Sequence, residues 1–299
     1  MFTRRGFLKL LWRGGLALAA MAGYPVVEAM AWPRIATYRL TPPNWTPGLK
    51  LRVAVIADVH ACEPWMSAER IKSICDRANT LEADVILLLG DYVSGMNLVT
   101  DYVHSSDWSK AMAGLSAPLG VHAVLGNHDY WEDLAFQRDQ TIEPFAKAAL
   151  VGVGIPVLVN DAIRLEKDGH GFWLAGLGDQ VALRPGKRFE RAGWQGLDDL
   201  PETLAKVTDD APVILMAHEP DIFPDVPERV SLTLSGHTHG GQINVFGWKP
   251  IVPSRYGPRY AAGHIEEAGR HLVVSKGLGC SIIPVRFMSW PEIVLLELG

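Results

Sequence analysis

Short apolar runs recur along the chain, and five of them end in polar residues. These five runs cover residues 51–58, 83–91, 121–129, 212–220 and 231–239. They are rich in valine, isoleucine and leucine, which is typical of strands buried in a sheet. Patterns with helical spacing follow the first two runs, at residues 67–81 and 106–114, and Ser67 is placed to cap the first of them. Strands that alternate with helices in this way indicate βαβ units.

Other apolar runs extend the predicted sheets. Residues 155–160 and 172–177 are expected to be strands, and residues 271–277 and 292–298 have the pattern of consecutive strands. We therefore predict an α/β fold, a sandwich of two mixed β-sheets flanked by helices. Residues 51–299 are expected to form this domain.

The polar ends of the five runs carry a consistent set of side chains. In open α/β sheets, ligands bind beyond the carboxyl ends of the strands. Carboxylates, an amide and imidazoles are the oxygen and nitrogen ligands of borderline divalent metals. Each side chain alone is as well explained by a turn, a helix cap or a buried histidine, but together they predict a metal site. The nine residues concerned are Asp58, His60, Asp91, Asn127, His128, Asp129, His218, His237 and His239.

Two pairs of these residues have a spacing of two. Because residues i and i+2 of an extended backbone point to the same side, Asp58 with His60 and His237 with His239 are each expected to face one centre, if the backbone stays extended. Adjacent residues of an extended backbone point to opposite sides, so Asn127 can face the metal while His128 faces the substrate. Glycines at positions 236, 240 and 241 are expected to let the backbone approach the site.

Five sequence blocks resemble, in order, the signature blocks of the calcineurin-like metallophosphoesterases. They are D-V-H at 58–60, G-D at 90–91, G-N-H-D at 126–129, A-H at 217–218 and G-H-T-H at 236–239. Longer phrases such as G-N-H-D-Y-W and S-G-H-T-H-G-G-Q-I resemble the bacterial twin-arginine-exported branch of that family, the YaeI/YkuE-like group of phosphodiesterases. The resemblance implies a metallophosphoesterase-type sandwich.

The resemblance also implies two divalent metal ions, which would be manganese, iron or zinc. The seven implied ligands form two sets that share one carboxylate: Asp58, His60 and His239 for the first ion, Asn127, His218 and His237 for the second, and Asp91 between them.

Two further residues receive catalytic roles from the same resemblance. His128 would contact the phosphoryl oxygen or protonate the leaving group, and Asp129 would orient His128. The expected reaction is hydrolysis of a phosphodiester or pyrophosphate by a metal-bridging hydroxide that attacks phosphorus in line. One alternative is a lipid-linked substrate, as for a UDP-2,3-diacylglucosamine pyrophosphatase. Another is a binding module of the envelope without catalysis, which is expected to lack ligands that are all present here.

The N-terminal part has the features of an export segment. Residues 3–9 read T-R-R-G-F-L-K, a twin-arginine pattern, and residues 29–31 read A-M-A, an A-x-A cleavage site. We expect residues 1–31 to direct export by the twin-arginine machinery to the periplasm or cell envelope. A membrane anchor, with association at the membrane surface, is the alternative. Residues 32–50 contain several prolines and are expected to be a linker with little regular structure.

The composition narrows the choice of partners. The net charge of −5 offers no basic footprint for nucleic acid. The three cysteines, Cys62, Cys75 and Cys280, form no C-x-x-C motif and are expected to be buried thiols.

Several residues outside the five blocks stay open. Arg255, Arg259 and Lys276 are equally compatible with binding a substrate phosphate and with being solvated charges. Apolar residues near the C-terminus are expected in the core rather than on a lipid-facing surface: Ile282, Ile283, Phe287, Met288 and Trp290. The remaining histidines match no block and are expected on the surface or in the core: His104, His122, His170, His264 and His271.

Overall fold

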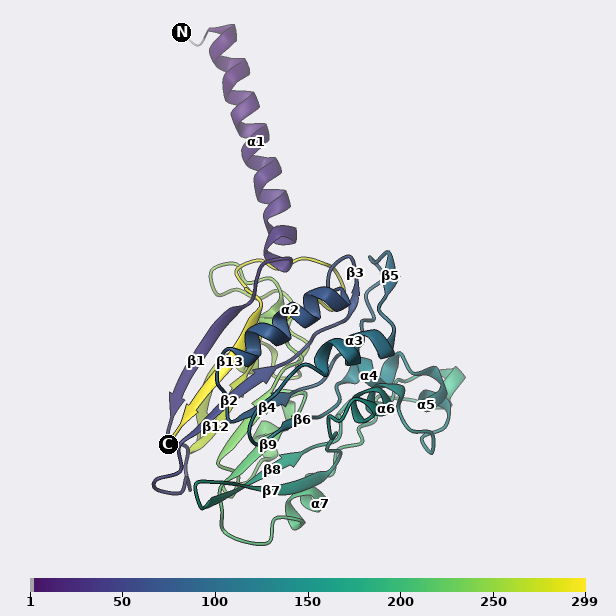
Figure 1. Ribbon diagram of the computed structural model, residues 1–299. Helices are drawn as coiled ribbons and strands as arrows, with labels where there is room; N and C mark the ends of the chain where they lie inside the picture. The colour runs from purple at the N-terminus through teal and green to yellow at the C-terminus, as the bar shows by residue number, and fades with distance from the viewer. Residues whose placement is uncertain (1–2) are drawn as a thin grey trace.

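Two β-sheets face each other in the computed structural model, which describes residues 3–299 (Figure 1). One sheet has the strand order β1-β13-β2-β4-β6 and the other the order β11-β12-β10-β9-β8-β7. Both contain parallel and antiparallel pairs, so the predicted sandwich of two mixed sheets is confirmed. The strands of the first sheet are β1 (Arg34–Leu40), β2 (Leu51–Ile56), β4 (Val85–Leu88), β6 (Val121–Ala123) and β13 (Glu292–Leu298). Those of the second are β7 (Asp161–Lys167), β8 (His170–Gly176), β9 (Val213–Met216), β10 (Leu232–Ser235), β11 (Gly263–Glu267) and β12 (Arg270–Val274).

The main core lies between the two sheets. Alternate residues of facing strands form one buried cluster there, with Val53 and Leu87 from the first sheet and Leu174, Ile214 and Leu234 from the second. Side chains alternate between the faces of a strand, so the other residues of these strands face the helices. This packing fixes the two sets of strand ends relative to each other.

Helices cover the outer faces of the sandwich. A second buried cluster joins the first sheet to α2 (Ala68–Asn79), α3 (Ser105–Met112) and α6 (Phe145–Gly152), whereas α7 (Leu200–Ala205) packs on β7 and β8. The predicted cap of the first helix is confirmed, because the Ser67 hydroxyl accepts a hydrogen bond from the Arg70 amide at 3.2 Å. The shorter helices and strands are α4 (Asn127–Trp131), α5 (Leu134–Arg138), β3 (Cys62–Glu63) and β5 (Asp101–Tyr102). The 3-10 helices are η1 (Lys187–Phe189), η2 (Pro220–Asp225), η3 (His239–Gly241) and η4 (Gly257–Tyr260).

Strand β1 lies within the stretch that was expected to be a linker. It pairs in parallel with β13 from Arg34 opposite Glu292 to Leu40 opposite Leu298. Ala36, Tyr38 and Leu40 alternate along it and pack against the core between the sheets. The expectation of little regular structure is therefore wrong here, because the prolines lie on either side of this alternating segment and not inside it.

The predicted strand at residues 155–160 is also wrong. Only Val157 forms a bridge there, to Ala123 at the end of β6. Pro156 has no amide hydrogen to donate to a ladder, which limits pairing at this position.

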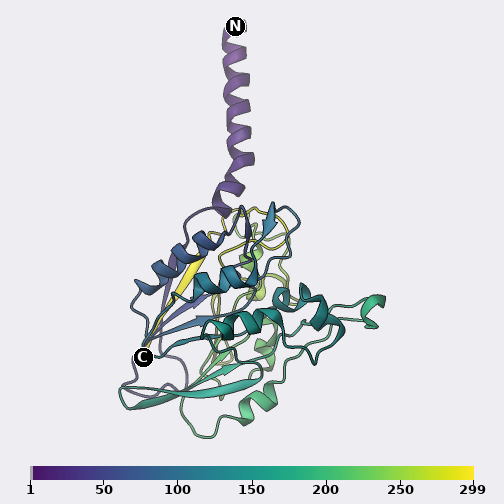
Figure 2. The same ribbon diagram turned by 45° about the vertical axis from the view of Figure 1, so that its right-hand side comes forward.

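The N-terminal helix α1 (Arg4–Ala29) projects from the sandwich in both views (Figures 1 and 2). Within residues 3–299 we find no helix with the length and apolar character needed to span a membrane. Met1 and Phe2 of the expected export segment lie outside the described residues. The last turn of α1 packs on the sandwich: Ala29 is buried, and the buried Glu28 carboxylate accepts hydrogen bonds from the amides of Met288 (3.0 Å) and Ser289 (2.6 Å).

The three thiols are free and buried, as predicted. The C-terminal apolar residues differ from the expectation: Ile282, Ile283 and Met288 are 72%, 40% and 45% exposed, so the core assignment is wrong for them.

Candidate metal centre

Five strand ends bring the predicted residues to one place. Asp58 and His60 follow β2, Asp91 follows β4, and Asn127 begins α4 just after β6; His218 follows β9, and His237 and His239 follow β10. Since β2, β4 and β6 belong to one sheet and β9 and β10 to the other, the site lies where the two sheets meet at their carboxyl ends.

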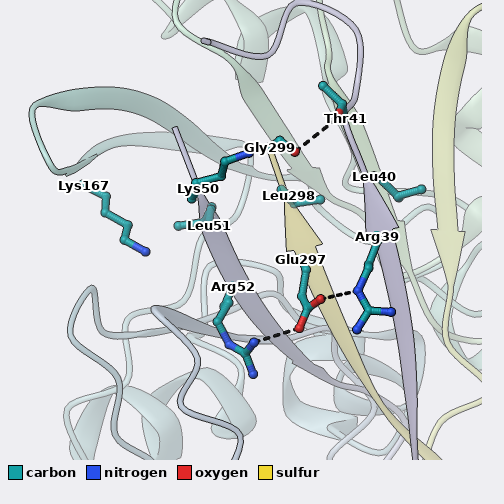
Figure 3. Close-up of a pocket in the computed structure, with 10 residues that line it drawn as sticks. All are labelled: Arg39, Leu40, Thr41, Lys50, Leu51, Arg52, Lys167, Glu297, Leu298 and Gly299. Carbon is teal, nitrogen blue, oxygen red and sulfur yellow. Dashed lines mark hydrogen bonds and ion pairs between the residues drawn. The ribbon is translucent and has the colours of Figure 1, made fainter. Parts of the chain in front are cut away.

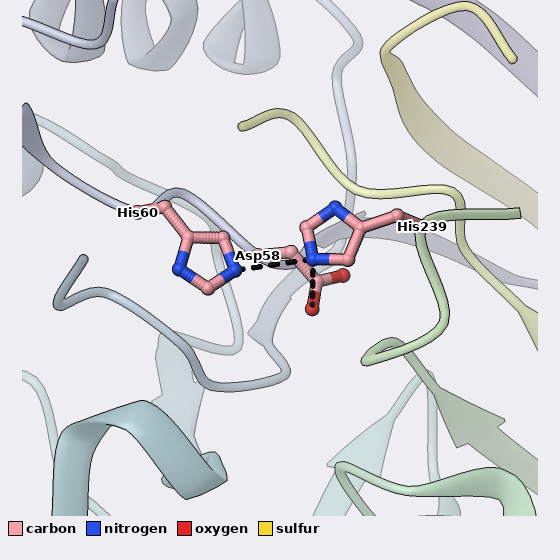
Figure 4. A group of neighbouring side chains, drawn as sticks. All are labelled: Asp58, His60 and His239. Atoms are coloured by element: carbon pink, nitrogen blue, oxygen red, sulfur yellow. Dashed lines mark hydrogen bonds and ion pairs between the residues drawn. The ribbon is translucent and has the colours of Figure 1, made fainter. Parts of the chain in front are cut away.

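A first triad consists of Asp58, His60 and His239, whose ligand atoms lie within 4.8 Å of one another (Figure 4). Nε2 of His60 and Nε2 of His239 are 3.1 Å apart, and Nε2 of His239 lies 3.9 Å from Oδ1 of Asp58. All three residues are buried. This is the group that the resemblance assigns to the first ion.

A second triad consists of Asp91, His218 and His237. Oδ2 of Asp91 lies 3.3 Å from Nε2 of His218 and 3.5 Å from Nε2 of His60. The same carboxylate oxygen therefore approaches both triads. Oδ1 of Asn127 lies 2.8 Å from Nδ1 of His237, which places the amide at the second triad.

The backbone at these residues is not extended. Asp58, His60, Asp91, His237 and His239 have φ angles of 54°, 49°, 58°, 67° and 52°. The left-handed region is uncommon for residues with a side chain and marks strained positions in functional sites. The predicted convergence occurs, but the extended-backbone reason for it was wrong, because both residues of each i, i+2 pair have left-handed backbone.

Backbone carbonyls hold the imidazole rings from behind. Nδ1 of His60 lies 3.1 Å from the carbonyl oxygen of Val93, and Nδ1 of His218 lies 2.6 Å from that of Leu89. A proton on Nδ1 that is donated to a carbonyl leaves the lone pair on Nε2, which is the form that ligates metal.

Burial gives the site polar atoms that the protein does not satisfy. Oδ2 of Asp58 is buried and has no hydrogen-bond partner among the described residues, and Nε2 of His218 has only the Asp91 carboxylate beside it, at 3.3 Å. Buried polar groups without partners are costly, and metal coordination is one way to satisfy them. The donor set, one carboxylate between clustered imidazoles, therefore fits divalent cations.

The pKa values of the buried candidate ligands differ strongly from their ordinary values. Burial raises the pKa of Asp58 to about 7 and lowers the pKa of His60 to about 3. Burial alone would raise the pKa of Asp91, but His218 and His128 beside it hold that pKa well below its usual value. Asp91 is thus the carboxylate that stays ionised in the absence of metal.

His128 lies at the edge of both triads. Its Nδ1 is 3.3 Å from Oε1 of Glu132, and its Nε2 is 3.3 Å from the Ser281 hydroxyl. Burial would lower the pKa of His128, but Asp91 and Glu132 raise it overall. A ring that holds a proton more firmly than usual, beside the ligands, suits a proton donor.

The Asp129 carboxylate makes no hydrogen bond with the His128 ring, contrary to the expectation that it orients this ring. Its carboxylate instead accepts hydrogen bonds of 2.9–3.1 Å from four backbone amides: those of Asp91, Tyr92, Val93 and Gly126. The residue therefore shapes the loop that carries Asp91, and the partners that orient His128 are Glu132 and Ser281.

Two carboxylates that the sequence analysis missed lie against His218. Asp179 and Glu219 are buried, and a ligand atom from each lies within 4.8 Å of one from His218. Burial and the neighbouring Glu219 raise the pKa of Asp179 well above its usual value. Asp179 follows β8, so the same signal, a strand that ends in a carboxylate, was present in the sequence.

Of the three glycines that were expected to let the backbone approach the site, only Gly236 lies against a candidate metal ligand. A Cβ atom at this position would come within 2.7 Å of Oδ2 of Asp58. Gly240 and Gly241 have left-handed φ angles and instead face Lys276 and Lys249.

The structure distinguishes the three charged residues whose role the sequence did not decide. Arg259 forms two hydrogen bonds with Glu267, and Lys276 pairs with Glu292 at 3.2 Å. Arg255 is also paired, since its Nη2 donates to the carbonyl of Asp221 at 3.0 Å and its Nε lies 3.8 Å from the Asp221 carboxylate, but it lines a recess beside His237. Arg255 is therefore the one of the three that borders the candidate metal centre.

Two recesses border the centre, and Pro253 lines both. One has a volume of about 480 Å³ and is lined by His237, Arg255 and the packed rings of Trp131 and Trp194. The other, of about 200 Å³, is lined by His239 and mostly apolar residues.

A separate hollow of about 500 Å³ lies at the opposite end of β2, around Leu51 (Figure 3). Three of the cations that line it are paired: Arg39 and Arg52 with Glu297, and Lys167 with Asp84. It contains none of the candidate ligands.

Comparison with known proteins agrees with this geometry. A model of the calcineurin-like phosphoesterase family matches residues 51–241, a range that contains all the predicted ligands. The metallophosphoesterase YkuE of Bacillus subtilis (strain 168), named as uncharacterized, is 29% identical over 99% of this chain and 97% of its own length. Phosphodiesterase YaeI of Escherichia coli (strain K12) is 28% identical, with 100% of each chain covered. An uncharacterized metallophosphoesterase of Aquifex aeolicus (strain VF5) is 29% identical over 89% of this chain and 91% of its own length.

Proposed function

The chain belongs to the calcineurin-like phosphoesterase family, and we propose that it is a phosphodiesterase with two divalent cations at the junction of its sheets. The family makes the protein a metal-dependent phosphohydrolase. The proposal adds that it binds two cations and prefers phosphodiesters. The observation that carries the proposal is the position of Asp91, whose Oδ2 lies 3.5 Å from Nε2 of His60 and 3.3 Å from Nε2 of His218. A carboxylate within reach of both triads supports two cations that share it.

The residues would divide as the resemblance implies. Asp58, His60 and His239 would hold one cation, and Asn127, His218 and His237 the other, with Asp91 shared. When bound, such a pair polarises the phosphoryl group and lowers the pKa of a bound water. Manganese, iron and zinc all suit these nitrogen and oxygen ligands.

His128 would act on the leaving group. Its ring is held between Glu132 and Ser281, and Asp91 and Glu132 raise its pKa, so it would donate a proton to the oxygen that departs from phosphorus. The non-catalytic alternative has less support, because each predicted ligand is present and buried or half-buried at one site.

The two recesses support a diester over a monoester. A phosphodiester carries two substituents on phosphorus, and a recess lies beside each triad, one lined by His237 and one by His239. A monoester would fill only one of them. A lipid-linked phosphoester is the second candidate, and the exposed isoleucines beside His239 favour it.

The test is hydrolysis of bis-p-nitrophenyl phosphate by purified protein that has been stripped with chelator and reloaded with Mn²⁺. We expect hydrolysis that requires the metal, and slower turnover of p-nitrophenyl phosphate. His237→Asn should abolish it, whereas His104→Asn is the matched control, because His104 caps α3 away from the site and asparagine also caps helices. Metal-loaded protein that is inert on diesters and pyrophosphates would refute the proposal.

Export by the twin-arginine route to the cell envelope is proposed from the T-R-R-G-F-L-K pattern alone. Replacing Arg4 and Arg5 by lysines should retain the protein in the cytoplasm, as seen by cell fractionation. Normal export of that variant would exclude this route.

A further inference from the structure

An apolar groove opens directly beside the metal centre. Six residues form most of its walls: Ile243, Pro250, Ile251, Pro253, Ile282 and Ile283. We call this recess of about 200 Å³ the isoleucine groove. His239 of the first triad and Ser281, whose hydroxyl contacts His128, also line it. The groove is therefore continuous with the candidate active site.

The polar side chains of the groove are occupied by the protein itself. Nε2 of Gln242 donates hydrogen bonds to the carbonyls of Ile283 and Val285 at 3.0 Å, and Oε1 of Gln242 accepts one from the backbone amide of Ser281 at 2.9 Å. The Thr238 hydroxyl donates to the carbonyl of Ala261 at 2.6 Å. A ligand thus meets a surface that offers mainly dispersion and apolar contact.

The groove is formed before any ligand arrives. Its two walls are joined by backbone hydrogen bonds from Phe287 to Gln242 (2.9 Å) and from Asn244 to Phe287 (2.8 Å). A wall that is already ordered loses little conformational entropy on binding.

The outer rim leaves large apolar side chains in water. Ile282 is 72% exposed and Ile251 is 71% exposed, and Phe246 and Trp248 on the adjoining loop are 87% and 66% exposed. Contiguous exposed apolar residues mark binding sites more often than isolated ones do. The loops concerned lie at the end of the sandwich from which α1 projects, in light green and yellow (Figure 1).

We propose that the isoleucine groove binds an alkyl chain of the substrate, so that the protein cleaves amphiphilic phosphoesters. The inference rests on the proposed phosphodiesterase function and names its substrate class. The phosphoryl group would lie at His239 and His128, and the chain attached to it would run past Ser281 between Ile251 and Ile282 toward solvent. The recess lined by Trp131 and Arg255 would take the second substituent.

The kinetic test uses alkyl p-nitrophenyl phosphodiesters with methyl, butyl and octyl chains, below their micelle concentrations, on the Mn²⁺-loaded full chain. We expect kcat/KM to rise about threefold per methylene over the first few carbons and to level off when the chain passes the rim. Equal kcat/KM for the methyl and octyl esters would overturn the proposal.

Variants separate the groove from general effects. Ile282→Gln should remove most of the chain-length dependence of kcat/KM. Ile142→Gln is the matched control, because Ile142 is also exposed (43%) but lies between α5 and α6. A chain-length dependence that Ile282→Gln and Ile142→Gln both leave intact would place the alkyl chain elsewhere and overturn the proposal.

A binding measurement keeps this inference apart from the proposed function. Calorimetry with octylphosphonate and methylphosphonate should show tighter binding of the octyl compound by at least tenfold, and Ile282→Gln should abolish the difference. If no ester is hydrolysed, the proposed phosphodiesterase function fails. The affinities for octylphosphonate and methylphosphonate still test whether the groove binds an alkyl chain, and equal affinities would overturn that inference.

Discussion

Nε2 of His60 and Nε2 of His239 face each other at 3.1 Å, although the two residues follow strands of different sheets, β2 and β10. Two nitrogens that bind one cation at about 2.0–2.1 Å lie roughly 3–3.5 Å apart in a tetrahedral site. Burial lowers the pKa of both rings, so both are neutral at pH 7. The sandwich therefore holds the two rings at a separation suited to a shared cation.

Asp91→Asn should remove metal and activity together. The substitution keeps the shape but removes the charge that both triads share, so we expect loss of one or both ions and a fall in turnover of more than about a hundredfold. Metal content by mass spectrometry and hydrolysis of bis-p-nitrophenyl phosphate measure the two effects. Asp76→Asn is the control, because Asp76 is exposed on α2. A variant that retains both ions and full activity would exclude Asp91 as the shared ligand.

His128→Asn should separate catalysis from metal binding. Since His128 lies at the edge of the triads, we expect normal metal content and a decrease in kcat of about 10²–10⁴-fold, the usual contribution of a general acid. Glu132→Gln should have a smaller effect, because it removes only the charge beside Nδ1. Unchanged turnover of His128→Asn would refute the assigned role.

Asp129→Asn should destabilise the metal-free protein. An amide nitrogen in place of one carboxylate oxygen would face backbone donors, and buried donors without an acceptor cost about 1–3 kcal/mol each. Urea unfolding of the metal-free variant should show this loss relative to Asp76→Asn. Full stability together with reduced turnover would instead indicate a direct role of Asp129 at His128.

The Asp58 carboxyl should lower the stability of the metal-free protein as pH rises from 5 to 7, whereas the lowered pKa values of His60 and His239 act in the opposite direction. The unfolded chain releases the Asp58 proton near its ordinary pKa of 3.8, whereas the folded chain keeps it until about pH 7. At this carboxyl the unfolded state therefore binds fewer protons in this window, and its contribution to the free energy of unfolding should decrease by on the order of 2 kcal/mol. Urea unfolding at both pH values, with and without Asp58→Asn, measures it; an equal pH dependence in the variant would exclude Asp58 as the cause.

The sequence predicted which residues come together better than it predicted the backbone that holds them. Runs such as 51–58 indicate both a buried strand and the polar end that follows it, and sheet topology brings such ends together. The left-handed backbone at Asp58 and His239 is not encoded in the local spacing of the ligands, which is the same for an extended chain.

The structure of β1 and the exposure of Ile282 were predicted wrongly from composition, and both errors have a physical reason. Prolines near β1 concealed the alternation of Ala36, Tyr38 and Leu40, which becomes informative only beside β13. Apolar character predicted that Ile282 is buried, because composition alone cannot distinguish a core residue from one that lines an open groove.

The most direct test is a crystal structure of the Mn²⁺-loaded protein with anomalous scattering recorded for manganese. The proposal predicts two peaks about 3.5–4 Å apart, one within reach of Asp58, His60 and His239 and one within reach of Asn127, His218 and His237, with Asp91 in contact with both. A single peak at saturating Mn²⁺, or two peaks that do not share Asp91, would contradict it.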